Sequence, residues 1–151
     1  MKEIDADSID VVNAIELFEH VKIIQVGLEE CCRVLKKGGT FIISTPFLFL
    51  IHADPYDFQR WTATKWKYEL KKIGLRIEEF IIMGKYLTRL SEILKSLLES
   101  IERNHSLIGR IFYRIFSPIL DRILRLDKKS FVLNDPKLNY YHNGYFIIAK
   151  K

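Results

Sequence analysis

Four short runs of apolar and β-branched residues along the chain predict four strands. The first is IDVVNAI at residues 9–15, and the second is TFIIST at 40–45, which Pro46 ends. The third covers 76–83, and the fourth, YFIIA at 145–149, follows an Asn-Gly pair. Apolar runs without strict alternation are typical of strands buried on both faces of a sheet.

Apolar residues at helical spacing separate the first three strands. A first helix is expected to end in Lys36 and Lys37 before Gly38 and Gly39, because cations and glycine complement the exposed carbonyls at a helix end. A second helix is expected at 62–73, before Gly74. Strand, helix and strand joined by short loops predict a right-handed crossover and a parallel sheet, here with only two core helices.

The segment at 85–140, before the last strand, differs in pattern and charge, so we expect a helical insert there and a sheet domain formed by 1–84 and 141–151. Between residues 85 and 129 there are ten Lys and Arg against five Asp and Glu, which accounts for the whole net charge of +5. Two amphipathic helices are predicted. Their apolar stripes are Leu87, Leu90, Leu94, Leu97, Leu98 and Ile101, and then Ile108, Ile111, Phe112, Ile115, Phe116, Ile119, Ile123 and Leu124.

Two interpretations of this insert stay open. It is either a helical hairpin that covers the sheet or a pocket, or a basic amphipathic element at 106–125 that lies on a membrane surface or holds a lipid-like substrate. Nucleic-acid binding is disfavoured, because the aromatic and arginine positions form no evident stacking groove.

Composition limits the remaining classes. The chain has 151 residues, 48% of them hydrophobic, which indicates one folded domain rather than a disordered chain. Cys31 and Cys32 are adjacent and cannot easily bridge each other, and the chain opens without a secretory pattern, so we expect a cytoplasmic protein, peripheral to a membrane if the insert binds lipid. No uncharged stretch reaches the ~20 residues that span a bilayer.

Three segments in order resemble the later half of a class I S-adenosylmethionine-dependent methyltransferase, of the type 11 domain. They are IDVV at 9–12, ELFEHV at 16–21 and RVLKKGGTFIISTP at 33–46, with Lys37 in place of the family's usual proline. The resemblance covers residues 7–75, and 144–149 fits the family's last strand. It implies an α/β fold: a partial Rossmann-like sheet of about four strands, the fourth to seventh of seven, with the last strand antiparallel and a helical insert before it.

The resemblance also implies what this chain lacks. The family binds its cofactor with a glycine-rich turn after the first strand and an acidic residue at the end of the second. No G-x-G occurs in this sequence, and Asp5 lies too close to the matched segment to be a convincing counterpart of that acidic residue. We therefore expect the first three strands to be absent from the chain and binding of S-adenosylmethionine by this chain alone to be in doubt.

The family places part of its cofactor floor at the end of the first strand expected here. This position corresponds to Asn13, Ala14, Ile15 and Glu16, and the signature that follows includes His20. The alternative is a plain strand-to-helix turn with Glu16 in solvent and His20 in an orienting or packing role.

The segment HADPYDFQRWT at 52–62 resembles HGDPYDYWRFT, a stretch that borders the acceptor pocket in some of these enzymes. By this resemblance His52 is the candidate base, Asp57 orients it, and Arg60 pairs with an acidic group of the substrate. In the alternative, Asp57 and Arg60 pair with each other and Thr62 caps the next helix. The sequence leads us to assign no metal ligands.

These observations support two functional hypotheses. The first is a methyltransferase, or its C-terminal portion, acting on a small or lipid-linked acceptor. The second is a non-catalytic, truncated module that binds a partner chain or a membrane surface. In both, residues 10–15 become an apolar sheet edge, so we expect pairing with a second copy or with a separate chain that carries the N-terminal half.

Overall fold

The computed structural model describes residues 3–104 and 106–151. The chain divides into two compact units. The sheet unit runs up to Met83 and includes Gly144–Lys151, and the insert unit is Gly84–Asn143.

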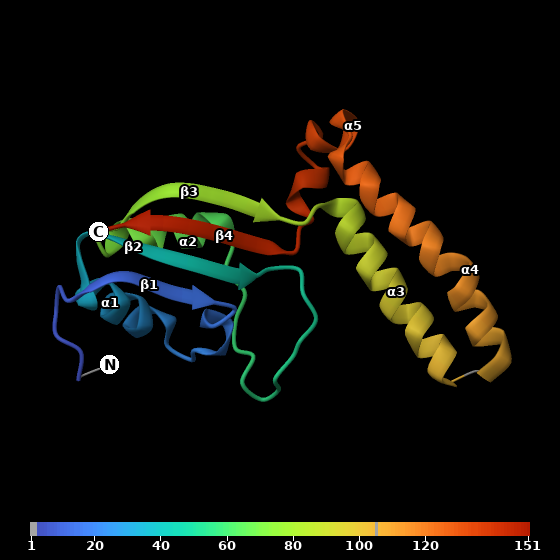
Figure 1. Ribbon diagram of the computed structural model, residues 1–151, viewed down its shortest axis with the longest axis horizontal. Helices are drawn as coiled ribbons and strands as arrows, with labels where there is room; N and C mark the ends of the chain where they lie inside the picture. The colour runs from blue at the N-terminus through green and yellow to red at the C-terminus, as the bar shows by residue number, and fades with distance from the viewer. Residues whose placement is uncertain (1–2, 105) are drawn as a thin grey trace. The chain divides into compact units, whose positions relative to one another are not determined.

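The sheet unit is built on four strands in the order β1-β2-β4-β3 (Figure 1). They are β1 (Ile9–Ile15), β2 (Leu35–Pro46), β3 (Arg76–Met83) and β4 (Gly144–Lys150). β1 and β2 are parallel, whereas β4 lies antiparallel between β2 and β3. The predicted α/β fold, with about four strands and an antiparallel last strand, is confirmed.

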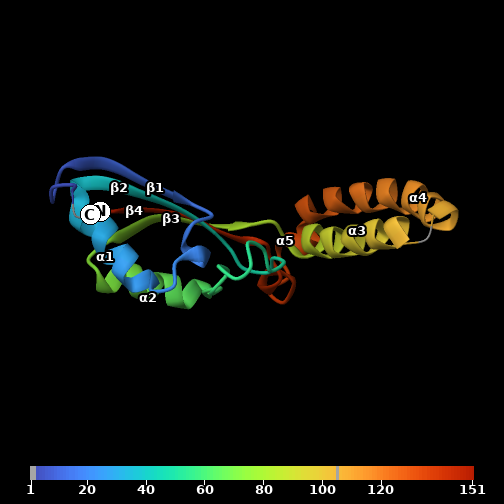
Figure 2. The ribbon, with the colours of Figure 1, turned by 90° about the horizontal axis from the view of Figure 1, so that it is seen from below.

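Two helices, α1 (Ile24–Val34) and α2 (Ala63–Lys72), cover one face of this sheet (Figure 2). Phe18 packs edge-on against Phe41 of β2, at 6.0 Å between ring centroids, and also contacts Trp66 of α2. The core between helices and sheet further contains Leu28, Leu35, Ile43, Leu70 and Ile147, all with no exposed surface. The described residues of the sheet unit thus form one helical layer, where α/β sheets usually have two.

On the other face of the sheet, no helix of the sheet unit covers the strands in the part of that unit that the structure describes. Ile15 of β1 pairs with Ser44, Ser44 with Phe146, and Phe146 with Ile81 of β3, so these side chains form one row across that face. Ile15 and Ile81 are 46% and 47% exposed. Isoleucines this exposed on a sheet face mark a surface that another structure can cover.

The end of α1 differs from the sequence-based prediction. The helix ends at Val34, and Lys36, Lys37, Gly38 and Gly39 lie in β2 rather than in or after a last helical turn. Leu35 is fully buried and pairs with Ile9, so the chain must leave the helix there to run beside β1. A side chain on Gly39 would lie 3.1 Å from the Asp10 carbonyl oxygen, a close approach that favours glycine at this position.

The insert unit is a helical hairpin of α3 (Tyr86–Asn104) and α4 (Ser106–Leu124), followed by the short helices η2 (Arg125–Lys128), α5 (Ser130–Leu133) and η3 (Leu138–Tyr140). The buried Asp127 carboxylate accepts the backbone N–H groups of Leu87 and Thr88, at 3.0 and 2.7 Å. It satisfies two of the free donors in the first turn of α3. Among the helices in the described residues, none has the length and apolar character needed to cross a membrane.

Candidate functional site

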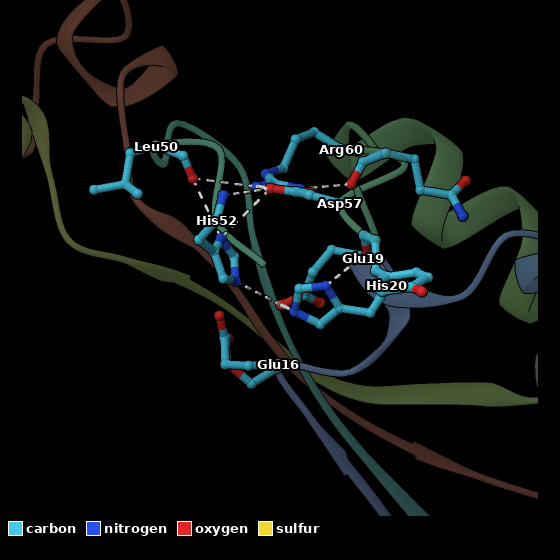
Figure 3. Close-up of polar contacts among 10 residues, drawn as sticks. Glu16, Glu19, His20, Leu50, His52, Asp57 and Arg60 are labelled. Carbon is cyan, nitrogen blue, oxygen red and sulfur yellow. Dashed lines mark hydrogen bonds and ion pairs between the residues drawn. The ribbon is translucent and has the colours of Figure 1, made fainter. Parts of the chain in front are cut away.

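A cluster of ionisable side chains lies where β1 and β2 end. The short helix η1 (Phe18–His20) follows β1 and carries Glu19 and His20, and the loop after β2 carries His52. The imidazole rings of His20 and His52 meet edge-on, at 4.9 Å between centroids (Figure 3). Two segments more than thirty residues apart thus contribute to one site at the carboxyl edge of the parallel pair, where open α/β sheets place their ligands.

Glu19 is the centre of this cluster. Its side chain is buried, and neither carboxylate oxygen has a hydrogen-bond partner within the described chain. The Nε2 atoms of His20 and His52 lie 3.7 and 4.0 Å from Oε1 of Glu19. Burial raises the pKa of the Glu19 carboxyl, because removal from water penalises its charged form.

The outer ring nitrogens of both histidines contact oxygen atoms. His20 Nδ1 lies 2.9 Å from the carbonyl oxygen of Tyr56. His52 Nδ1 lies 3.3 Å from the carbonyl oxygen of Leu50 and 3.4 Å from Oδ2 of Asp57. These contacts favour a proton on each Nδ1, which leaves each Nε2 as an acceptor directed at Glu19.

Asp57 and Arg60 form a two-pronged ion pair in the same loop. Arg60 Nη2 donates to Asp57 Oδ2 at 2.7 Å, and Nη1 donates to Oδ1. Asp57 also accepts the backbone N–H of His52 at 3.0 Å. The Arg60 guanidinium holds the pKa of Asp57 well below its usual range, with this backbone N–H adding to the effect. Thr62 caps α2 by accepting the N–H of Lys65, so the structure contains the arrangement expected in the alternative interpretation.

The position of Asp57 next to His52 is compatible with the orienting role predicted for it. A role of Arg60 toward a substrate anion stays a prediction, as do the catalytic roles of His52 and Asp57. Ala53, beside His52, has a φ of +54°, a left-handed conformation that glycine adopts most readily. The stretch that this loop resembles has glycine at that position.

The predicted cofactor residues lie at the end of β1. Ala14 is buried toward the helices, whereas Asn13 and Ile15 are exposed. Glu16, with a φ of +47°, accepts a hydrogen bond from the hydroxyl of Ser44, so it is tied to β2 and not simply solvated. His20 lies in the cluster with Glu19 and His52. Cofactor binding by these residues stays a prediction.

Glu19 was given no chemical role by the sequence, although it belongs to the quoted ELFEHV segment. Its position directly after buried Phe18 was the one signal that could have indicated a buried carboxylate. Its meeting with His52 depends on the path of the loop after β2, which local sequence patterns do not determine.

Comparisons with known proteins give one family match over part of the chain and several structural matches. The family model Methyltransf_11, described as a methyltransferase domain, matches residues 2–43. No curated protein matches the sequence significantly.

Solved structures match over 99% of the chain. A SAM-dependent methyltransferase from Archaeoglobus fulgidus has a TM-score of 0.56 at 17% identity, with 62% of its length covered. An O-methyltransferase of Brevibacillus brevis, in complex with S-adenosyl-L-homocysteine, has a TM-score of 0.55 at 13% identity, with 46% covered. Phosphoethanolamine N-methyltransferase 2 of Haemonchus contortus, in complex with phosphomonomethylethanolamine and S-adenosylhomocysteine, has a TM-score of 0.52 at 19% identity, with 34% of its length covered. The chain therefore spans between a third and two thirds of these proteins.

Proposed function

We propose that this chain, which carries the later part of a class I methyltransferase domain, forms the acceptor side of an S-adenosylmethionine-dependent methyltransferase. The observation that carries this proposal is the cluster of Glu19, His20, His52 and Asp57 at the ends of β1 and β2. The acceptor we propose is small or lipid-linked, since the insert unit offers an apolar surface with basic flanks.

The residues present fit part of the cofactor. The exposed end of β1, from Asn13 to Glu16, is suited to a cofactor floor, while the glycine-rich turn has no counterpart in this sequence. Bound S-adenosylmethionine would supply the methyl group by in-line displacement, which requires alignment of donor and acceptor. His52 Nε2 takes the proton that the acceptor loses as its new bond to carbon forms, and Asp57 holds the imidazole ring in place.

Titration of the ¹⁵N-labelled chain with S-adenosylhomocysteine tests this function. We expect shifts in the backbone amide signals of residues 13–16, with a dissociation constant no tighter than about 0.1 mM, because the glycine-rich turn does not contribute. Ile15→Arg is expected to abolish these shifts. Ile81→Arg is the matched control, because Ile81 lies on the same sheet face at equal exposure but on the opposite edge strand.

Absence of shifts at millimolar ligand, or shifts confined to other strands, would contradict the proposed cofactor floor. That result would favour the non-catalytic module. Micromolar binding by the chain alone would contradict the non-catalytic hypothesis instead.

The free edge of β1 favours a partner chain as part of either function. β1 pairs only with β2 within the described residues, and its Val11 and Ile15 are 54% and 46% exposed. Unpaired N–H and C=O groups along an apolar edge are a template for a further strand. We propose that a second copy, or a separate chain with the earlier strands, pairs there.

The hairpin of the insert unit supports peripheral binding to an anionic membrane surface. Arg110 and Arg114 are exposed on α4, and the 85–129 segment carries twice as many cations as anions. An exposed apolar face with arginine flanks is typical of helices that lie in a lipid interface. The apolar residues more than a third exposed are Leu90, Ile93, Leu94 and Leu97 of α3 and Leu107, Ile108, Ile111, Phe112, Ile115, Phe116 and Ile119 of α4.

A further inference from the structure

We infer that Glu19, His20 and His52 form a binding site for a divalent first-row transition metal ion, of which Zn²⁺ is the natural probe. This inference does not rest on the proposed methyl transfer: an ion on His52 Nε2 occupies the lone pair that takes the acceptor's proton, so the proton transfer belongs to the metal-free chain. It rests on the convergence of three donor atoms, on the burial of the carboxylate and on the contacts behind both imidazole rings.

The spacing of the three donors suits one shared ion. One donor atom from each residue lies within 4.8 Å of the other two, and Oε1 of Glu19 lies 3.7 and 4.0 Å from the two imidazole Nε2 atoms. Zinc–ligand bonds of roughly 2.0–2.2 Å place neighbouring tetrahedral ligands about 3.4 Å apart. The two distances from Glu19 exceed this spacing by about 0.3 and 0.6 Å, and the two imidazole donors lie within 4.8 Å of each other, so modest side-chain rotations are needed to bring all three donors into coordination.

The Glu19 carboxylate needs a compensating positive species. Its side chain is 0% exposed, and no described residue donates a hydrogen bond to it. Leaving a buried carboxylate uncompensated is strongly unfavourable. The two histidines direct nitrogen lone pairs rather than N–H groups at it when their protons are on Nδ1, so a cation at the shared point satisfies all three donors together.

The groups behind the imidazole rings are those that support metal ligands in proteins. A ligating histidine usually donates its other ring N–H to a carbonyl or carboxylate, which fixes the tautomer and ring orientation. His20 Nδ1 meets the Tyr56 carbonyl, and His52 Nδ1 meets the Leu50 carbonyl and the Asp57 carboxylate. Asp57 is itself held by Arg60. Both candidate ligands thus have the outer contacts that the role requires.

The donor set selects the class of ion. Two imidazole nitrogens and one carboxylate oxygen suit Zn²⁺, Co²⁺ or Fe²⁺, whereas Mg²⁺ and Ca²⁺ prefer oxygen ligands alone. Three protein ligands leave at least one coordination position for water or a further ligand. The His20 and His52 side chains are 25% and 30% exposed, so this position is reachable from solvent.

Calorimetric titration of the full chain with ZnCl₂ at neutral pH tests the site. We expect one ion per chain, and we expect His20→Ala and His52→Ala each to weaken binding by about 100-fold or more, beyond the range seen for loss of an outer contact. Two matched controls should leave the affinity unchanged. Asp10→Asn removes an exposed carboxylate that forms an ion pair with Lys36, and Cys32→Ser removes the more exposed of the two thiols.

A second readout locates the ion without a variant. In ¹⁵N spectra of the histidine side chains, Zn²⁺ is expected to shift the Nε2 signals of His20 and His52. The inference is overturned if no zinc binds at about 1 mM, if binding is lost in Cys32→Ser rather than in His52→Ala, or if these Nε2 signals do not move. Any of these results would mean that Glu19, His20 and His52 do not hold a metal ion together. The S-adenosylhomocysteine titration reports on β1 and is independent of these outcomes.

Discussion

Replacing Asp57 by alanine is expected to lower the free energy of unfolding by about 3 kcal/mol, although the residue lies in a loop. Its side chain is 3% exposed, and it pairs with Arg60, which is 19% exposed. It also accepts the N–H of His52. The substitution leaves one cation without its partner and one backbone donor without its acceptor, and each loss is costly away from water. Urea unfolding followed by the fluorescence of buried Trp61 and Trp66 measures the change.

Asp54→Ala is the matched control in the same loop, because Asp54 is exposed. We expect it to change the stability by no more than about 0.5 kcal/mol. Equal effects of the two substitutions would contradict the role given to the Asp57–Arg60 pair in holding this loop.

Reversing the charge of Arg110 and Arg114 together is expected to weaken binding to phosphatidylserine-containing vesicles by about 100-fold or more. Each basic residue near an anionic leaflet contributes about 1 kcal/mol, and reversal replaces that attraction by repulsion. Two reversals therefore exceed the roughly 2.7 kcal/mol that corresponds to 100-fold. Co-sedimentation of the chain with vesicles of phosphatidylcholine, with and without phosphatidylserine, measures the effect.

Lys37→Glu with Arg76→Glu is the control for net charge, because both positions are exposed in the sheet unit. This pair should leave vesicle binding nearly unchanged. Phe112→Ser with Phe116→Ser should weaken binding through the apolar contribution alone, since these two stacked rings are 47% and 43% exposed. Binding that is equal for neutral vesicles, or a hairpin that associates with a second copy instead, would contradict the membrane proposal.

The strands could be predicted from sequence because their signals are local. Residues 9–15 and 76–83 were predicted with the bounds that the structure shows, and the apolar runs alone were sufficient. The end of α1 was predicted wrongly, because lysine and glycine residues after an apolar helical stripe commonly mark the end of a helix. What overrides that signal is the pairing of Leu35 with Ile9, a contact between distant parts of the chain.

Part of the candidate site could likewise be predicted from the sequence, and part could not. His20 and His52 could be named from the family resemblance, and so could Asp57. The central position of Glu19 could not, because it depends on the burial of its side chain and on the return of the 47–61 loop to η1. The backbone N–H of Phe58 donates to the Glu19 carbonyl at 2.9 Å, and this hydrogen bond joins the loop to η1. Local sequence patterns do not predict such a contact.

The function proposed above requires the free edge of β1 to be paired in the working protein. Sedimentation velocity combined with hydrogen exchange over residues 10–15 tests this requirement most directly. We predict an associated species whose β1 amides exchange slowly, and a shift to monomer with fast exchange in Val11→Lys but not in Ile81→Lys, because a charge on the pairing edge opposes a further strand. A monomer whose β1 amides exchange freely would contradict the account.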